Sequence, residues 1–287
     1  MKQRPTFPAQ LDATLAKNRP NAQGALMPRG ALQGKPATAS LQLAAALPAI
    51  KAKPVHHLPA NVVPHGVGMD SSAVRTRMVQ KLAEGGVRDP LVLAAMGAIE
   101  RHRFVDSALA NQAYEDTSLP IGLGQTISKP GVVSRMIELM RNGATGRLGR
   151  VLEIGTGCGY QAAVLSMVAD EVYSIERLRG LHDKARENLR LLRVANLHLL
   201  FGDGMVGYAK GAPYAAIIAA AGGEAIPQAW VDQLAMGGRL VAPVAQGGTA
   251  GGVGGAQALM VIDKTPQGIR QTVLEAVHFV PLKSGVA

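Results

Sequence analysis

The residues of this chain best suited to chemistry are glycines and carboxylates gathered near its middle. Three glycines follow the short apolar run 151–154 at alternate positions, namely Gly155, Gly157 and Gly159. Glycine permits positive φ and lets a ligand approach the main chain closely. Residues 160–168 read as a helix, and a second apolar run ends at Glu176. A strand, a glycine turn, a helix and a second strand ending in an acid form the nucleotide-binding half of a doubly wound sheet.

Two classes of cofactor fit this layout. The fingerprint for nicotinamide dinucleotides requires a third glycine at the place of Tyr160, where it packs the helix against the strand. Here the third glycine comes one residue earlier, at Gly159. Tyr160 therefore argues against a nicotinamide-dependent dehydrogenase. The form Glu-x-Gly-x-Gly-x-Gly, which begins at Glu153, resembles the first motif of S-adenosylmethionine-dependent methyltransferases.

The elements that must position these residues alternate along the chain. Apolar runs, glycines and prolines predict helices at about 72–84, 90–102, 130–140, 160–168, 178–192 and 227–234. The same signals predict strands at 151–154, 171–176, 197–201, 215–221 and 239–243, followed by a closing antiparallel pair at 257–262 and 272–281. The segment 113–128 is expected to be a loop. We therefore predict an α/β, Rossmann-like fold with a mostly parallel, doubly wound sheet.

The first 70 residues differ in composition from the rest. They are rich in Ala, Pro, Gln and Gly, and few large apolar residues are available to offset the entropy of ordering. Eight basic and two acidic residues lie there, so +6 of the net charge of +10 belongs to this segment. We expect residues 1–70 to be a disordered basic extension and residues 71–287 to be the folded domain. Within that domain, 71–145 would form an N-terminal helical cap and 146–287 the cofactor-binding sheet with its closing strands.

Composition limits the possible partners. The basic charge suggests nucleic acid, but only 3% of residues are aromatic and most of the charge is in the extension, so nucleic acid is an unlikely partner. No apolar run approaches the ~20 residues that span a membrane, and the first residues lack the apolar region of a secretory signal. The seven histidines show no metal spacing, and Cys158 is the single cysteine. We therefore expect a cytoplasmic protein without a metal.

Motifs from about Val74 to the C-terminus, roughly three quarters of the chain, resemble the protein-L-isoaspartate O-methyltransferases. The segment Gly-Gln-Thr-Ile-Ser-Lys-Pro, residues 124–130, is close to diagnostic of that family. The other matching segments are 88–90, 101–105, 114–116, 119–123, 151–160, 202–204, 237–240 and 279–282. The resemblance implies transfer of a methyl group from S-adenosylmethionine to the carboxylate of L-isoaspartyl residues in damaged proteins, which initiates their repair.

The resemblance also implies roles for single residues on the cofactor side. Gly155, Gly157 and Gly159 would admit the methionine part of the cofactor, and Glu153 would reach its ammonium group directly or through water. Glu176 would accept both ribose hydroxyls, with a solvated strand-end carboxylate as the alternative. Asp203, beside Gly204, would accept from the adenine amino group, with a turn-forming aspartate as the alternative.

On the acceptor side the resemblance points to residues 126–128. Ser128 would hold and orient the isoaspartyl carboxylate as the catalytic residue, and Thr126 and Ile127 would shape the substrate channel. A carboxylate is already ionised at neutral pH, with a reference pKa near ~4. No strong general base is therefore needed, and the sequence offers no compelling one. A helix N-cap before Pro130 is the alternative role for Ser128, and the two roles are compatible.

One departure and two other functions stay open. The family usually carries an aspartate where this chain has Ala215, which weakens any expectation of polar contacts near that strand. Another methyl acceptor, a small carboxylate or an RNA base, is the nearest alternative function. Residues 219–222 lack the Asn/Asp-Pro-Pro-aromatic motif of nucleic-acid amino-methyltransferases. The remaining alternative is a nucleic-acid-binding protein on a vestigial nucleotide fold.

Overall fold

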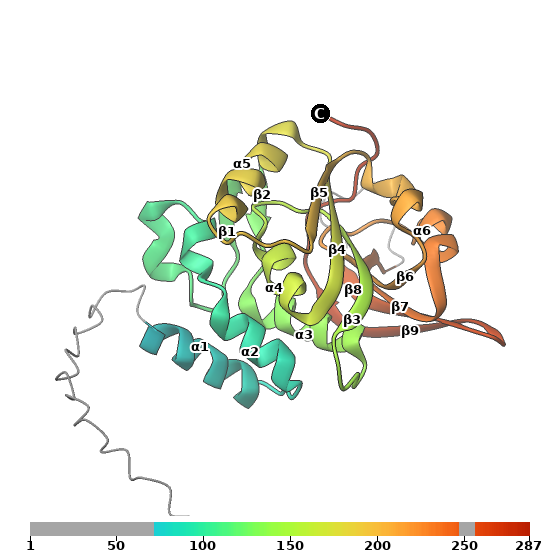
Figure 1. The fold of residues 1–287 in the computed structure, drawn as a ribbon, viewed down its shortest axis with the longest axis horizontal. Coiled ribbons are helices and arrows are strands. Elements are labelled where there is room, and N and C mark those ends of the chain that lie inside the picture. The colour runs from blue at the N-terminus through green and yellow to red at the C-terminus, as the bar shows by residue number, and fades with distance from the viewer. Residues whose placement is uncertain (1–71, 247–255) are drawn as a thin grey trace, which may run out of the picture. The chain divides into compact units, whose positions relative to one another are not determined.

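The computed structural model describes residues 72–246 and 256–287, and a seven-stranded sheet lies at its centre (Figure 1). The strand order is β5-β4-β3-β6-β7-β8-β9. The strands are β3 (Leu148–Ile154), β4 (Ala169–Glu176), β5 (Leu197–Phe201), β6 (Tyr214–Ala219), β7 (Leu234–Ala245), β8 (Gln257–Thr265) and β9 (Gly268–Val277). The first five of these pair in parallel, while β8 and β9 add antiparallel pairs at one edge. The predicted mostly parallel, doubly wound sheet is confirmed.

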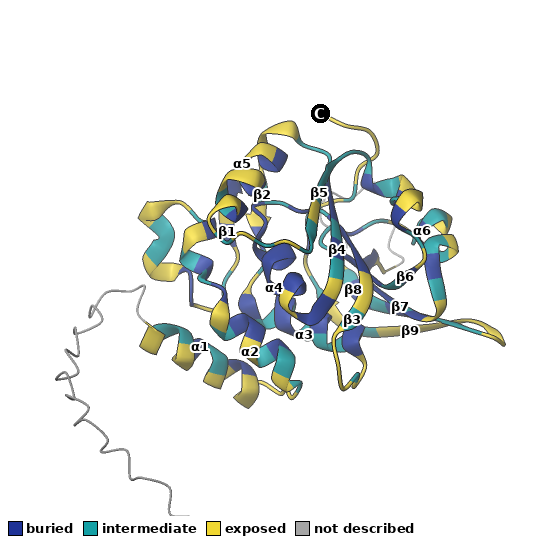
Figure 2. Cartoon of the chain, viewed as in Figure 1, coloured by how far each residue is buried: buried dark blue, intermediate teal, exposed yellow. Residues whose placement is uncertain are grey.

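Helices cover both faces of this sheet. They are α1 (Ser72–Glu84), α2 (Pro90–Ala98), α3 (Pro130–Arg141), α4 (Tyr160–Val168), α5 (Arg179–Arg190) and α6 (Gln228–Gln233). Because side chains alternate along a strand, Val151 joins the apolar core that includes residues of α1 to α5. Its neighbour Leu152 joins a second core on the opposite face with Trp230 of α6. Figure 2 shows α4 among the most deeply buried helices and α1 with an exposed outer face.

Two local predictions were wrong. The second helix does not reach His102 but ends at Ala98, because Ile99 adopts extended backbone and a separate 3-10 turn follows at Arg101–Phe104. The expected loop at 113–128 contains a hairpin of β1 (Leu119–Gly122) and β2 (Gln125–Ile127). Alternate residues of β1 are buried, and a turn with positive φ at Leu123 and Gly124 joins the two strands. That alternation is the strand signal which the loop assignment overlooked.

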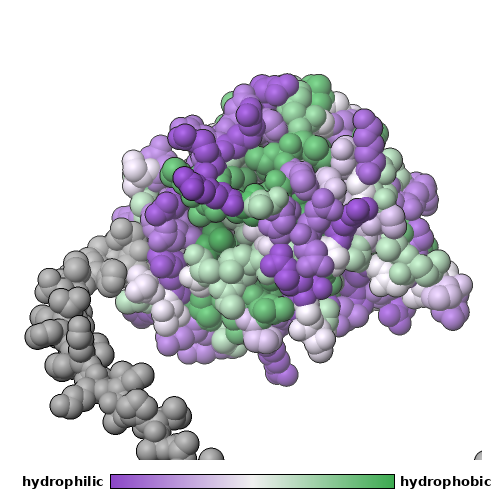
Figure 3. Space-filling model, viewed as in Figure 1, coloured by the Kyte–Doolittle hydropathy of each residue, from purple (hydrophilic) through white to green (hydrophobic). Residues whose placement is uncertain are grey.

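The surface of the described residues gives no sign of a membrane span. No helix in 72–246 or 256–287 is both long and apolar enough to cross a bilayer. On the face drawn in Figure 3, hydrophilic groups divide the apolar side chains into small areas. The predicted disordered extension, residues 1–70, lies outside the described part of the chain.

Candidate active site

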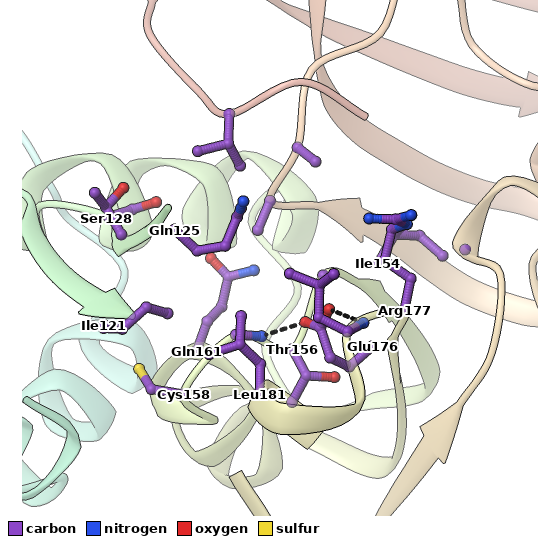
Figure 4. A pocket seen from close by; sticks show the side chains of 18 of the residues that line it. Ile121, Gln125, Ser128, Ile154, Thr156, Cys158, Gln161, Glu176, Arg177 and Leu181 are labelled. Carbon is purple, nitrogen blue, oxygen red and sulfur yellow. Dashed lines mark hydrogen bonds between the residues drawn. The ribbon is translucent and has the colours of Figure 1, made fainter. Parts of the chain in front are cut away.

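A cavity of about 230 Å³ opens at the carboxyl ends of the parallel strands (Figure 4). Its walls come from the ends of β3, β4 and β6, from the glycine loop before α4, from the β1–β2 hairpin and from the C-terminal residues 280–283. Ligands in open α/β sheets bind at this edge, where loops after neighbouring strands leave a crevice. The sheet therefore brings most of the predicted site residues to one place.

Glu176 lies at the end of β4 and lines the cavity while being only 5% exposed. Its Oε2 accepts a hydrogen bond from the main-chain N–H of Gly157 at 2.9 Å, and its Oε1 accepts one from Leu178 at 2.9 Å. Each carboxylate oxygen can accept more than one hydrogen bond. The carboxylate is therefore held in place by the main chain and still has capacity for a ligand's hydroxyl groups. The alternative of a solvated surface acid is wrong.

The glycine loop has the backbone shape that the sequence suggested. Gly157 has φ of +58°, and a Cβ there would come within 3.2 Å of the Ile121 side chain of the hairpin. Gly159 has φ of +92° at the N-cap of α4, and a Cβ there would lie 2.9 Å from Leu189. Side chains at these positions would meet the hairpin and α5, so glycine keeps both neighbours close to the loop. Gly155 and Gly157 line the cavity, whereas Gly159 does not.

Glu153 lies beneath this loop. It is completely buried on β3 and does not line the cavity. Its Oε2 accepts a hydrogen bond from the Ser174 hydroxyl, which also lies 2.6 Å from the Thr156 hydroxyl. Burial raises the pKa of Glu153 to about 8, and the charge of Glu176 adds to the rise, whereas Ser174 and Gln161 lower it. In the described chain this carboxyl therefore has no direct path to a ligand in the cavity.

Asp203 and Gly204 follow β5 and differ in their position. Gly204 lines the cavity. The Asp203 carboxylate instead accepts from Met205 N at 2.8 Å and from Gly285 N at 2.6 Å. It thus holds the turn after β5 and the C-terminal segment, as the turn-forming alternative anticipated. Its predicted contact with an adenine amino group remains a prediction.

The acceptor residues come from the hairpin. Thr126, Ile127 and Ser128 all line the cavity, with Ile127 buried and Thr126 exposed. The suggested N-cap role of Ser128 is wrong, because Lys129 occupies the position before α3 and no side chain caps that helix. Ser128 also lines a second, larger cavity of about 990 Å³. Charged side chains of that second cavity include Lys81, Asp116, Lys129, Arg135 and Glu275.

The sequence reasoning missed several parts of the wall. Gln161 in the first turn of α4 lines the cavity, as do Arg177 and the segment 280–283. Cys158 lines it too, is 2% exposed, and burial raises the pKa of its thiol. Gln161 is two residues after the last glycine of the loop, so its position close to the predicted ligand-binding turn was the available signal. Nothing in the sequence places the C-terminal segment at this edge. Among the described residues no group of acids, histidines and cysteine is arranged to hold a metal ion.

A parallel sheet of this order, with a glycine loop after β3 and an acid ending β4, defines the class I S-adenosylmethionine-dependent methyltransferase fold. Comparison with known proteins narrows the class. The family model "Protein-L-isoaspartate(D-aspartate) O-methyltransferase (PCMT)" matches residues 73–287. This chain belongs to that family, as its resemblance predicted.

Individual relatives agree with this placement. The chain is 62% identical to a protein-L-isoaspartate O-methyltransferase of Methylibium petroleiphilum, over 77% of this chain and 81% of that protein. A second such protein, from Leptothrix cholodnii, is 60% identical over 77% of each chain. A solved structure of a protein-L-isoaspartate O-methyltransferase superposes with a TM-score of 0.64 at 26% identity, covering 74% of this chain and 67% of that one.

Proposed function

We propose that this chain transfers the methyl group of S-adenosylmethionine to the carboxylate of L-isoaspartyl residues in damaged proteins, and so initiates their repair. One observation carries the proposal beyond family membership. Ser128 lines both the cavity at the sheet edge and the larger second cavity. A polypeptide lying in the second cavity would therefore meet the bound cofactor at Ser128.

The residues at the sheet edge suit a cofactor with a ribose and a charged amino-acid end. Glu176 has acceptor capacity for two hydroxyl groups while main-chain N–H groups fix its position. The glycine loop and Gly204 form neighbouring walls. Gln161 brings an amide group to the wall of the same cavity. When bound, the cofactor supplies an electrophilic methyl group on a positively charged sulfur.

The work left to the chain is chiefly positioning. An isoaspartyl carboxylate is already ionised at neutral pH, so no side chain has to remove a proton. Ser128 would donate its hydroxyl hydrogen to one carboxylate oxygen and so direct the other toward the methyl group. Ile127, Ile121 and Val133 line the same cavity with apolar surface that keeps water away from the reacting atoms. Orientation of this kind can supply on the order of 7–11 kcal/mol of the rate acceleration.

Partners and location follow from this activity. We propose isoaspartyl-containing proteins and peptides as the partners, in the cytoplasm, without a metal ion or a membrane. Two features support a protein acceptor. The second cavity has a volume of about 990 Å³, and its mixed charges, such as Lys129 beside Asp116 at 3.8 Å, offer hydrogen-bond partners for a main chain.

The test is methyl incorporation from labelled S-adenosylmethionine into two peptides of one sequence, one with isoaspartate and one with aspartate. We expect label in the isoaspartyl peptide alone, and the label should be released by mild base, as methyl esters are. Transfer to both peptides alike, or to added RNA instead, would overturn the proposed acceptor. A preparation that binds S-adenosylhomocysteine but labels neither peptide would leave the cofactor assignment standing and remove the isoaspartyl one.

A further inference from the structure

Two neighbouring polar groups beneath the glycine loop each have one buried atom without a hydrogen bond. Buried side-chain atoms without a hydrogen bond in the described residues are Arg101 Nη1, Glu153 Oε1 and Gln161 Nε2. The last two belong to adjacent groups, since the Gln161 amide is close enough to lower the pKa of Glu153. A buried polar atom left without a partner is unfavourable, because it has lost its hydrogen bonds to water without gaining one in the fold. If these two atoms pair with each other, the amide oxygen of Gln161 is left as an acceptor at the wall of the cavity.

Gln161 connects the buried carboxyl with the cavity. It is 8% exposed and lines the cavity, whereas Glu153 is fully buried and does not. Figure 4 shows the Gln161 amide inside the cavity, between Ser128 on one side and Glu176 on the other. An amide has one edge that donates and one that accepts. If its nitrogen turns toward the carboxylate, its oxygen faces the ligand.

The strand order indicates which part of the ligand lies beside Gln161. Along the sheet edge β5, β4 and β3 are neighbours in that order, and they end near Gly204, Glu176 and the glycine loop respectively. With the ribose on Glu176, the reacting sulfur lies between Glu176 and Ser128, because the methyl group must face the acceptor. The amino-acid end branches from that same sulfur. It therefore falls beside the residues that follow β3, which include Gln161.

We propose that Gln161 binds the α-ammonium group of the cofactor through its amide oxygen while its amide nitrogen donates to Glu153. The inference rests on the proposed function. An ammonium group carries only donors and needs an acceptor, and the Glu153 carboxyl keeps an oxygen that accepts whether or not it is protonated, so the amide matches both neighbours at once. The terminal torsion of glutamine is broad, so a small rotation lets Nε2 reach Oε1. Glu153 then acts on the cofactor through Gln161 rather than by contact or through water.

Calorimetry with three neutral-sulfur ligands tests this assignment. S-adenosylhomocysteine carries the whole amino-acid end, 5′-(3-aminopropylthio)-5′-deoxyadenosine keeps the ammonium without the carboxylate, and 5′-methylthioadenosine lacks both. Gln161→Leu should weaken the first two by at least about tenfold, as expected for one hydrogen bond to a charged group, and leave the third unchanged. A loss for S-adenosylhomocysteine alone would assign Gln161 to the carboxylate and overturn the proposal. Equal losses for all three would mean a disturbed cavity and would also overturn it.

Two further variants complete the experiment. Gln271→Leu is the matched control, since Gln271 is exposed on β9 and lines neither cavity, and it should leave all three affinities unchanged. Glu153→Leu, which removes the acceptor oxygens, should weaken S-adenosylhomocysteine binding in the wild-type chain but not in Gln161→Leu, because the carboxyl acts through the amide. If the losses of affinity in the two single variants add up in the double variant, the carboxyl does not act through the Gln161 amide. Methylation of the isoaspartyl peptide by the wild-type chain, measured on the same preparation, separates failure of this inference from failure of the proposed function.

Discussion

The two walls of the cavity are built in different ways. The sheet wall consists of strand ends and the glycine loop, where main-chain N–H groups hold Glu176, and behind it the Ser174 hydroxyl holds Glu153. The hairpin wall is a two-stranded sheet whose turn is exposed, with Leu123 62% exposed. The Lys184 side chain, which donates to Ile121 O at 2.9 Å, links it to α5.

This difference matches two different tasks. A single cofactor needs one fixed set of contacts, and the central sheet provides them because its strand ends are buried and hydrogen-bonded on both sides. Damaged proteins present many sequences around an isoaspartyl residue, and a short peripheral hairpin can adjust to them with little effect on the core. Changes in the sheet wall should therefore affect cofactor affinity or stability, while changes in the hairpin should affect transfer alone.

The largest effect is expected for Glu176→Ala. Loss of two charge-assisted hydrogen bonds to the ribose corresponds to about 3–6 kcal/mol, or at least about a hundredfold in S-adenosylmethionine affinity. Isothermal calorimetry on the folded variant measures it. Glu171→Ala on the same strand is the control, because Glu171 pairs with Arg150 and His198 outside the cavity. Unchanged affinity in the Glu176 variant would remove this residue from the ribose role.

Glu153 should make stability depend on pH. Its folded-state pKa of about 8 lies above the ordinary value of 4.5. The protonated form is thus favoured by folding, and this contribution is full below pH ~4.5 and lost as pH rises toward 8. The loss is on the order of a few kcal/mol. Melting temperatures from pH 5 to 9 should fall less in Glu153→Gln than in wild type, whereas the exposed control Glu187→Gln should follow wild type. Parallel curves for all three would contradict the prediction.

Ser128→Ala tests the hairpin wall. Loss of one hydroxyl bond to a charged acceptor should cost about 1.5–3 kcal/mol in the transition state, or roughly ten- to 150-fold in kcat/KM. Cofactor affinity and melting temperature should stay near wild type, because Ser128 caps no helix. The exposed Ser107→Ala serves as control. A lower melting temperature with full turnover would refute the catalytic assignment and show that the two walls are not separate in function.

Removal of residues 1–70 should have the smallest effect. The family match begins at residue 73, and the predicted site residues lie between 126 and 204. Turnover on a short isoaspartyl peptide should therefore stay within about twofold, well inside the range of an ordinary surface change. Rates with large acidic protein substrates are expected to fall, and added salt should abolish the difference from wild type. A truncated chain that does not fold would place the domain boundary earlier than residue 71.

The sequence predicted the sheet wall better than the hairpin wall, for a physical reason. Gly157 and Glu176 belong to a local strand–turn–helix–strand unit whose geometry hardly depends on the rest of the chain. The strands of the hairpin at 119–127 are so short that their apolar alternation is a weak signal beside the glycines and the proline, which predict a loop. Packing against the rest of the domain decides the conformation of this segment. Gln161 was missed because nearly every residue of α4 is buried. Because α4 has no polar face, its pattern of apolar residues does not indicate which side chain points into the cavity.

The burial of Cys158 bears on whether the enzyme methylates itself. Its thiol belongs to the same cavity as the acceptor residues, and a thiolate is a stronger nucleophile toward an activated methyl group than a carboxylate. Burial raises the pKa of this thiol, which keeps it protonated and weakly nucleophilic at neutral pH. Prolonged incubation with S-adenosylmethionine alone should consequently leave the mass of the chain unchanged. Part of the enzyme's selectivity then comes from keeping the Cys158 thiol protonated. The methyl group is thereby transferred to damaged proteins rather than to the enzyme's own cysteine.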